Sequence, residues 1–289
     1  MPHAAATKPF LFRLGEFIRF SHTVFALPFA LIAMLVAGGG SVPWRVLGWI
    51  LVCMVAARTA AMCFNRLADW EIDKENPRTA ARHTLLARSS AWFVFALGVA
   101  VSIFAAWKLN PLCFYLSPVM IFLITFYSLT KRFTAYSHFF LGLALSVAPM
   151  GAWAAVRGEL WTITPYFLAG AVVCWVFGFD LIYSTLDAEF DRRKGLFSFP
   201  ARFGVPASLR LARILHVVAA LGFFVFGWLA GLGHGYWLAW LVVLAALVWE
   251  HRIANPDNPG SINAAFFNVN ALVSMSLLAG VLLNYYVRF

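Results

Sequence analysis

The chain has 289 residues, of which 62% are hydrophobic and only 12% are charged, whereas a soluble domain carries about 25% charged residues. This composition excludes a soluble globular protein and predicts an integral membrane protein. The formal net charge of +10 does not indicate a nucleic-acid partner, because in a membrane protein the placement of the charges matters more than their sum. We therefore expect membrane lipid, and no nucleic acid, around the chain.

The N-terminal segment, residues 1–20, is polar and basic, with Lys8, Arg13 and Arg19. It lacks a short apolar stretch that ends in small residues, so we expect no cleavable signal peptide. The apolar run that follows is therefore expected to be retained as the first membrane helix.

Nine apolar runs are candidates for membrane-crossing helices, because one crossing needs about 20 apolar residues. In chain order they cover residues 23–40, 44–64, 91–107, 111–129, 136–156, 161–186, 214–232, 236–249 and 264–287. The eighth run is short for one crossing. We predict an all-α bundle of nine transmembrane helices that forms a single domain over residues 1–289.

The segments between these spans carry their positive charges unevenly. With the N-terminus in the cytoplasm, most Lys and Arg residues outside the spans lie on the cytoplasmic side, and the outside holds only Arg45, Lys108, Arg157 and Arg288. The positive-inside rule therefore favours a cytoplasmic N-terminus and an outside C-terminus, in a bacterial inner membrane. Removing one span would destroy this asymmetry, which supports the short eighth run.

Eight of the twelve carboxylates fall in two clusters, each at the cytoplasmic end of an apolar run. The first cluster has the pattern Asn-Arg-x-x-Asp-x-x-x-Asp over residues 65–73. The second has the pattern Asp-x-x-Tyr-x-x-x-Asp-x-x-x-Asp over residues 180–191. If the helices continue through the clusters, the Asp residues of each cluster share one helix face.

The two clusters are equivalent in spacing. Asp69 and Asp187 are separated by 118 residues (187 − 69), and so are Asp73 and Asp191 (191 − 73). Each pair follows a membrane span, which indicates a faint internal repeat. Because repeated bundles often place a site where the repeats meet, we expect both clusters to contribute to one site on the cytoplasmic side.

Carboxylates gathered at the end of a membrane segment need a partner, because burying them unpaired is costly. Mg²⁺ prefers a few carboxylates, retained waters and substrate phosphates as ligands. If the Asp-bearing helix faces of the two clusters lie opposite each other, they predict such a site. Its candidate ligands are Asn65, Asp69, Asp73, Asp187 and Asp191. The alternative is a pair of solvated helix ends, but the doubled spacing favours the metal. Glu71, Glu75 and Glu189 lie off the Asp faces and are expected to be solvated.

Basic residues surround the clusters, and beside carboxylates and a metal such groups neutralise an anion such as diphosphate. The candidates for this role are Arg66, Arg78, Arg82, Lys131, Arg132 and Arg192. Arg58 and Asp180 differ because they lie inside spans, where charge is a functional candidate by default. Asp180 is a candidate partner for Arg58 or Lys131.

These motifs resemble the UbiA superfamily of membrane prenyltransferases over nearly the whole chain. The two acidic motifs, nine spans, Asn76-Pro77-Arg78-Thr79, and Tyr127 followed by Lys131-Arg132 carry the resemblance. Residues 17–30 and 198–204 resemble the 4-hydroxybenzoate polyprenyltransferase-like branch, which includes the proposed prenyltransferase of the futalosine menaquinone route. The chain departs from many relatives at Arg66, where they have Asp. It also departs at residues 83–86, which belong to a loop that is expected to cover the diphosphate.

The resemblance implies an aromatic polyprenyltransferase with two Mg²⁺ ions bridged by the diphosphate of a polyprenyl diphosphate. The acceptor would be 4-hydroxybenzoate or a dihydroxynaphthoate, in ubiquinone or menaquinone synthesis. The catalytic residues that the resemblance implies are Asp69, Asp73, Asp187, Asp191 and Tyr183, and the intramembrane charges Arg58 and Asp180 are added to them as candidates. Aromatic side chains are expected to wall the prenyl tunnel, and His22 is expected to be structural.

Two other classes of function remain open on the sequence. A transporter or cation channel would also use acidic coordination sites, but these usually lie near the middle of the membrane. A family member without activity, kept as an assembly partner, is disfavoured by the complete set of Asp residues. The oligomeric state is not predicted.

Overall fold

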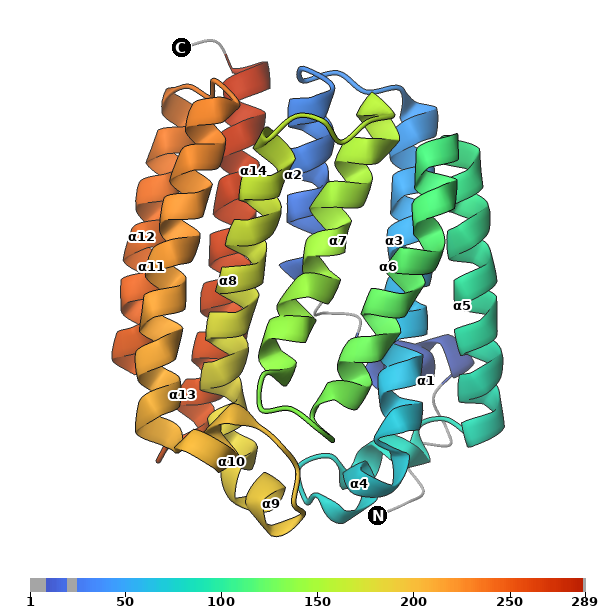
Figure 1. The fold of residues 1–289 in the computed structure, drawn as a ribbon, viewed down its shortest axis with the longest axis vertical. Helices are drawn as coiled ribbons and strands as arrows, with labels where there is room; N and C mark the ends of the chain where they lie inside the picture. The colour runs from blue at the N-terminus through green and yellow to red at the C-terminus, as the bar shows by residue number, and fades with distance from the viewer. Residues whose placement is uncertain (1–8, 20–24, 288–289) are drawn as a thin grey trace.

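The computed structural model describes residues 9–19 and 25–287, without the side chains of residues 11, 82 and 83, and it is an all-helical bundle (Figure 1). The long helices are α3 (Trp44–Ala68), α5 (Arg88–Leu109), α6 (Pro111–Thr130), α7 (Ser137–Arg157), α8 (Thr164–Ser184), α11 (Val205–Leu229), α12 (His234–Ile253) and α14 (Asn270–Tyr286). The short elements are α1 (Phe10–Phe17), α2 (Leu27–Ala37), α4 (Trp70–Glu75), η2 (Ala80–Thr84), η3 (Thr185–Asp187), α9 (Ala188–Arg193), α10 (Phe199–Phe203), α13 (Pro259–Ala264) and the π-helical turn η4 (Ala265–Val269).

Within the described residues, eight helices are long and apolar enough to cross a membrane, and α2 is a shorter apolar helix. The predicted all-α fold is therefore confirmed, and so is the eighth span, since α12 has 20 residues. The first span is shorter than predicted. The 11 residues of α2 are about 16 Å long, less than the hydrocarbon thickness.

The seventh span begins earlier than its apolar run, at Val205 instead of residue 214. Arg210 and Arg213 end the apolar run in the sequence, but both lie on the exposed face of α11 and do not interrupt the helix. Because arginine is a good helix former, the helix begins at Val205 although the apolar run begins only after Arg213.

α8 lies at the centre of the hydrophobic core. Its residues Leu168, Val172, Trp175 and Phe179 recur every three or four positions and are at most 2% exposed, as expected for one helix face packed against neighbours. Rings from other helices surround them, including Phe29 stacked on Phe223 at 5.6 Å between ring centroids. This packing fixes the helix that carries the second acidic motif.

Both motif-bearing helices break at equivalent residues. α3 ends before Asp69 and α4 follows, while α8 ends before the turn at Asp187 and α9 follows. The offsets between α4 and α9 are again 118 residues (188 − 70 and 193 − 75). Asp69 has φ −94° and ψ 14°, and Asp187 has φ −105° and ψ 0°, both in the bridge region common in active sites.

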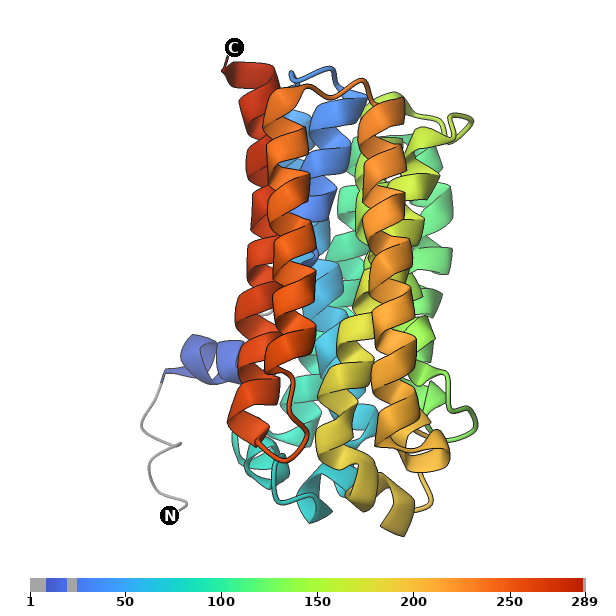
Figure 2. The same ribbon diagram turned by 90° about the vertical axis from the view of Figure 1, so that its left-hand side faces the viewer.

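α1 lies across the bundle instead of along it, near the end that holds α4 and α9 (Figures 1 and 2). Phe17 and Ile18 are buried against Met62, Cys63 and Leu67 of α3, while Phe10 and Phe12 are exposed. A helix with one buried and one exposed apolar edge is typical of the membrane interface.

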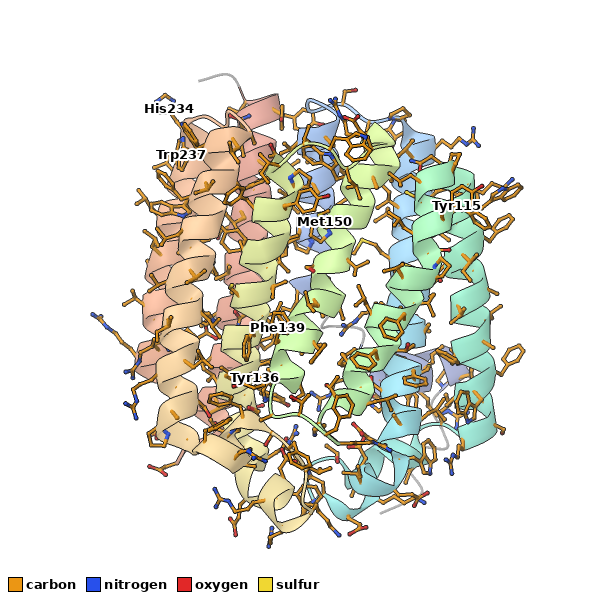
Figure 3. All side chains as sticks on the ribbon, viewed as in Figure 1. Tyr115, Tyr136, Phe139, Met150, His234 and Trp237 are labelled. Atoms are coloured by element: carbon orange, nitrogen blue, oxygen red, sulfur yellow. The ribbon has the colours of Figure 1, made fainter. Side chains whose placement is uncertain are left out.

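Aromatic side chains mark both ends of the bundle. Figure 3 places Tyr115 and Trp237 towards the end with the C-terminus and Tyr136 towards the end with α9. Trp44 and Trp161 are 85% and 91% exposed. Exposed Trp and Tyr near both ends are characteristic of membrane–water interfaces.

The contact between α7 and α8 generates a stability prediction. A Cβ at Gly142 would lie 2.6 Å from the backbone oxygen of Val173, so Gly142→Ala forces the two helices apart at a cost of about 1–3 kcal/mol. We expect a lower melting temperature in detergent. The matched control is Gly151→Ala on the same helix, where a Cβ meets nothing within 4 Å and the substitution stabilises by about 0.5–1 kcal/mol. Equal melting temperatures for the two variants would contradict this.

Candidate active site

The two acidic motifs lie together at the end of the bundle that holds α4 and α9 (Figure 1). Asn65 belongs to the last turn of α3, and its amide Nδ2 donates to Ser128 Oγ on α6 at 3.3 Å. Glu75 at the end of α4 pairs with Lys194 after α9. These contacts join the first motif to α6 and to the second motif, as the repeat predicts.

The carboxylates of the first motif face arginines. Asp73 Oδ2 accepts from Arg66 Nη1 at 3.1 Å, with side chains only 14% and 8% exposed. Asp69 Oδ1 lies 4.0 Å from Arg132 Nη2, which donates to the carbonyl oxygen of Ala68. Two of the predicted anion-binding residues therefore neutralise the first motif.

The second motif is bound by residues from the loop after α4. Arg78 holds Asp187 with two nitrogens, Nε at 3.0 Å and Nη2, and Asn76 Nδ2 donates to Asp187 Oδ1 at 3.2 Å. Arg78 Nη1 also donates to the Tyr183 hydroxyl at 2.7 Å. This bidentate arrangement uses the geometry that guanidinium offers to carboxylate and phosphate alike.

Asp191 is the most deeply buried of these carboxylates, with its side chain 3% exposed. Lys131 Nζ lies 3.9 Å from Asp191 Oδ1, and the Lys131 carbonyl accepts from Phe197 N at 2.7 Å. The loop after α9 therefore holds the residue that neutralises Asp191.

The described side chains form no cluster of three or more acidic, histidine or cysteine groups placed to hold one metal ion. The reason is that each motif Asp lies near its own cation instead of converging with the others. The donor set nevertheless fits a hard cation, since it consists of carboxylates and an amide. Asp69 Oδ1 is buried without a hydrogen-bond partner among the described residues, which leaves a ligand atom available.

The electrostatics of the site follow from this mixture. Burial raises the pKa of the Asp69 carboxyl above its ordinary value, and Lys131 is the largest opposing influence. Burial alone would lower the pKa of Lys131, but Asp191 and Asp69 reverse the effect and raise it. Lys131 is thus a persistent cation between the two motifs.

Asp180 has a different partner from the two that the sequence offered. His138 Nδ1 lies 2.6 Å from Asp180 Oδ2, so the hydrogen-bond partner of Asp180 is neither Arg58 nor Lys131. Of these two expected partners, Lys131 retains an electrostatic interaction with Asp180. His138 Nε2 is buried without a hydrogen-bond partner in the described part of the chain. His138 was not among the residues predicted for the site, although a lone histidine in the first turn of an apolar helix is a visible signal in the sequence.

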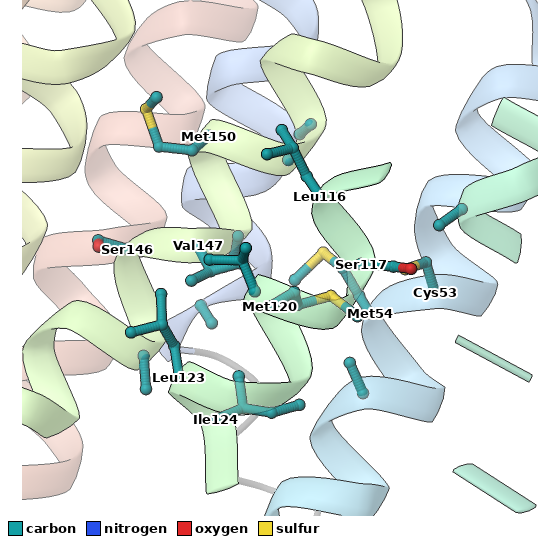
Figure 4. A pocket seen from close by; sticks show the side chains of 18 of the residues that line it. Cys53, Met54, Leu116, Ser117, Met120, Leu123, Ile124, Ser146, Val147 and Met150 are labelled. Carbon is teal, nitrogen blue, oxygen red and sulfur yellow. The ribbon is translucent and has the colours of Figure 1, made fainter. Parts of the chain in front are cut away.

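Arg58 lines an apolar cavity of about 350 Å³ between α3, α6 and α7. Figure 4 shows side chains that converge on it, including Cys53 and Met54 from α3, Met120 from α6 and Met150 from α7. The cavity wall is aliphatic and sulfur-containing, and its one aromatic residue is the Tyr127 beside Ser128. This cavity therefore has little of the aromatic wall expected for a prenyl tunnel, while rings such as Phe29, Trp175 and Phe179 pack in the core around α8.

Arg58 is the one charged residue of this lining, and its Nε is buried without a hydrogen-bond partner among the described residues. An unpaired guanidinium nitrogen in an apolar wall is costly. Leu116 and Val119, which also line the cavity, are 36% and 53% exposed on the protein surface. The cavity thus joins an apolar entrance to one half-buried cation.

The remaining predicted residues lie at the edge of the site or outside the description. Arg192 Nε donates to the carbonyl oxygen of Ala201 at 3.4 Å. Glu71 is 68% exposed and pairs with Lys74 at 2.9 Å, and Glu189 is exposed. The Arg82 side chain and the whole of His22 lie outside the described residues.

The model of the UbiA prenyltransferase family matches residues 26–272. The chain belongs to the UbiA prenyltransferase family. It is therefore an integral membrane protein and a prenyltransferase, which decides against a transporter or channel. Family membership also agrees with the two Asp motifs and with the helical bundle.

Curated relatives and a solved structure support this assignment. The chain is 30% identical over 264 residues to the 4-hydroxybenzoate solanesyltransferase of Synechocystis sp., covering 89% of this chain and 88% of that one. It is 30% identical over 246 residues to the 4-hydroxybenzoate octaprenyltransferase of Nitrosospira multiformis, with coverage of 84% and 82%. The apo structure of a UbiA homolog from Aeropyrum pernix K1 matches with a TM-score of 0.82 at 29% identity, over 91% of this chain and 97% of that one.

A more distant neighbour shares the fold. The UbiA homolog from Archaeoglobus fulgidus, solved with GPP and Mg²⁺, matches with a TM-score of 0.68 at 17% identity. The match covers 93% of this chain and 99% of that one.

The position of Lys131 generates a prediction about Asp69. Lys131→Gln removes the strongest influence that lowers the pKa of this buried carboxyl, so the pKa rises further and Asp69 takes up its proton at a higher pH. Infrared titration of the protonated carboxyl band measures this shift, and Asp69→Asn identifies the band by removing it. An unchanged titration in Lys131→Gln would refute the coupling.

Proposed function

We propose that this protein transfers a polyprenyl group from a polyprenyl diphosphate to a small aromatic acid, with Mg²⁺ as cofactor. The acceptor is 4-hydroxybenzoate or a dihydroxynaphthoate, for ubiquinone or menaquinone synthesis. The observation that carries the proposal is the arrangement of four Asp–cation pairs beside an apolar cavity lined by one arginine, whose Nε has no hydrogen-bond partner among the described residues. The names of the curated relatives support the acceptor class.

Asn65, Asp69, Asp73, Asp187 and Asp191 would hold the magnesium, as two ions bridged by the diphosphate. These oxygen donors fit Mg²⁺, and the buried, unpartnered Asp69 Oδ1 supports the assignment. When bound, the metal stabilises the negative charge that develops on the departing diphosphate. The homologous structure with GPP and Mg²⁺ is consistent with this role.

The basic residues change partners when substrate binds. Arg66, Arg78, Lys131 and Arg132 lie next to the carboxylates in this structure. When their carboxylate partners hold a metal, these four basic side chains would be free to bind diphosphate oxygens, which accept hydrogen bonds in the same geometry. Arg82 and Arg192 would complete this basic rim. The exchange keeps the charge of the buried site close to balanced with and without substrate.

The cavity receives the apolar substrate and orients the acceptor. Its aliphatic wall suits a prenyl chain, and Arg58 would bind the acceptor carboxylate, since that anion satisfies a buried guanidinium. Tyr127 lies between this cavity and the Asn65–Ser128 contact. The acceptor ring would thus lie between Arg58 and the diphosphate, with water excluded from the allylic cation.

Asp180 would accept the proton that the ring loses after carbon–carbon bond formation. It lies on α8 one turn before Tyr183, and 19% of its side chain is exposed. His138 holds one carboxylate oxygen and leaves the other for the ring proton. The basic loops of this end favour a cytoplasmic site in the bacterial inner membrane.

Loss of one metal ligand tests the function. Asp69→Asn and Asp187→Asn should each lower Mg²⁺-dependent prenyl transfer by about 10²-fold or more, the scale of losing one electrostatic group from a transition state. Product formation in membranes, analysed by mass spectrometry with one prenyl diphosphate and a panel of acceptors, measures this. Glu71→Gln, a substitution of an exposed acid in the same motif, should retain activity. Full activity in either Asp variant would overturn the metal assignment.

Arg58 should govern the acceptor and not the prenyl donor. Arg58→Met keeps an unbranched, flexible side chain but removes the charged guanidinium, so the KM for the aromatic acid should rise by about tenfold or more, as for one lost charge-assisted bond. The KM for the prenyl diphosphate should stay unchanged. Equal effects on both substrates would contradict this role.

The role of Asp180 predicts an isotope effect. With ring-deuterated acceptor, the wild-type protein should show almost no kinetic isotope effect, because loss of the proton follows the slow step. In Asp180→Asn, removal of the base should make proton loss limiting and give a normal primary effect. A slow variant without an isotope effect would assign Asp180 a structural role.

A further inference from the structure

The π-helical turn η4 interrupts the last membrane segment between α13 and α14. Such turns are rare, contain one extra residue and are frequent at functional sites. One residue corresponds to a rotation of about 100° around a helix axis. The extra residue in the turn therefore rotates the side chains of α13 and of the turn itself about the helix axis, relative to those of α14.

A buried polar pair holds this turn. Asn270, the first residue of α14, and Glu250, in the last turn of α12, are both 0% exposed. Asn270 Nδ2 donates to Glu250 Oε1 at 2.9 Å, and it also lies 3.0 Å and 3.3 Å from the carbonyl oxygens of Phe266 and Ala265. Buried carbonyls need such partners, so the pair stabilises the π turn against a regular helix.

The turn directs Phe266 at the candidate active site. The Phe266 ring stacks on Tyr183 with 4.2 Å between ring centroids and 29° between the planes. The Tyr183 hydroxyl accepts from Arg78 Nη1 at 2.7 Å, and the Arg78 guanidinium lies 5.2 Å from the centroid of the same ring. Arg78 in turn binds Asp187. Consecutive contacts therefore lead from Glu250 to a motif carboxylate.

We propose that Asn270 and Glu250 are positioning residues of the diphosphate site. They hold the π turn that places Phe266 against Tyr183, and the stacked Tyr183 ring fixes Arg78 where it can bind either Asp187 or a diphosphate. This inference rests on the proposed prenyl transfer. Without the turn, Phe266 rotates away from Tyr183, and Arg78 loses the support of an ordered ring.

The test compares two asparagines of the same helix in the full-length protein. In Asn270→Ala, the inhibition constant of inorganic pyrophosphate with Mg²⁺ and the KM for the prenyl diphosphate should each rise about tenfold, equivalent to 1.4 kcal/mol. The KM for the acceptor should not change. Asn284→Ala is the control, because Asn284 Oδ1 accepts from Gly233 N at 2.6 Å at the opposite end of α14, and its constants should match the wild type.

A second set of variants separates positioning from general stability. Phe266→Leu should reproduce the rise, and Asn270→Ala should add nothing in the Phe266→Leu background, because both act through one contact. Glu250→Gln, which retains an acceptor for Asn270, should preserve pyrophosphate affinity, whereas Glu250→Ala should lose it. These comparisons still apply if Asn270→Ala does not accumulate.

Two outcomes would overturn the inference while the proposed function stands. One is equal pyrophosphate inhibition in Asn270→Ala and Asn284→Ala, or in Phe266→Leu and the wild type. The other is a multiplied effect when Asn270→Ala and Phe266→Leu are combined, which would indicate independent structural roles. A wild-type protein that neither transfers prenyl groups nor binds pyrophosphate would instead refute the proposed function.

Discussion

The site depends on one electrostatic constraint, the need to neutralise four carboxylates at the end of an apolar bundle. The side chains of these four Asp residues are only 3–15% exposed, and an unpaired buried charge costs several kcal/mol. The structure meets the constraint with one cation near each Asp of the two motifs. Under the proposed function, the same four cations would also bind the diphosphate of the substrate.

These ion pairs join the two halves of the chain. Arg78 and Lys131 come from the first half and bind Asp187 and Asp191 of the second. Lys194 of the second half reaches back to Glu75 of the first. Because α4 and α9 follow equivalent breaks in their helices, the two halves meet symmetrically, and the site exists only when the halves are packed together.

The sequence was informative wherever the signal is local or periodic. Spans follow from runs of apolar residues, and Asp69 and Asp187 follow from helical spacing. Contacts across helices were not predictable, because they depend on packing between residues far apart in the chain. His138 meets Asp180 from another helix, and Phe266 meets Tyr183 through a π turn that no periodicity indicates. Some aromatic residues pack in the core around α8 and others are exposed on the surface, and the spacing of rings in the sequence does not distinguish the two groups.

The two sides of α7 pack differently against their neighbours. Towards α8, Gly142 allows backbone contact and leaves no room for adjustment. Towards α6, Met120 and Met150 line the cavity, and methionine is flexible enough to repack around irregular shapes. A cavity wall that repacks in this way would discriminate poorly between prenyl chains of different length. The prenyl chain length of the product in the cell would then be set by the prenyl diphosphate that is available, and not by the size of the cavity in this protein.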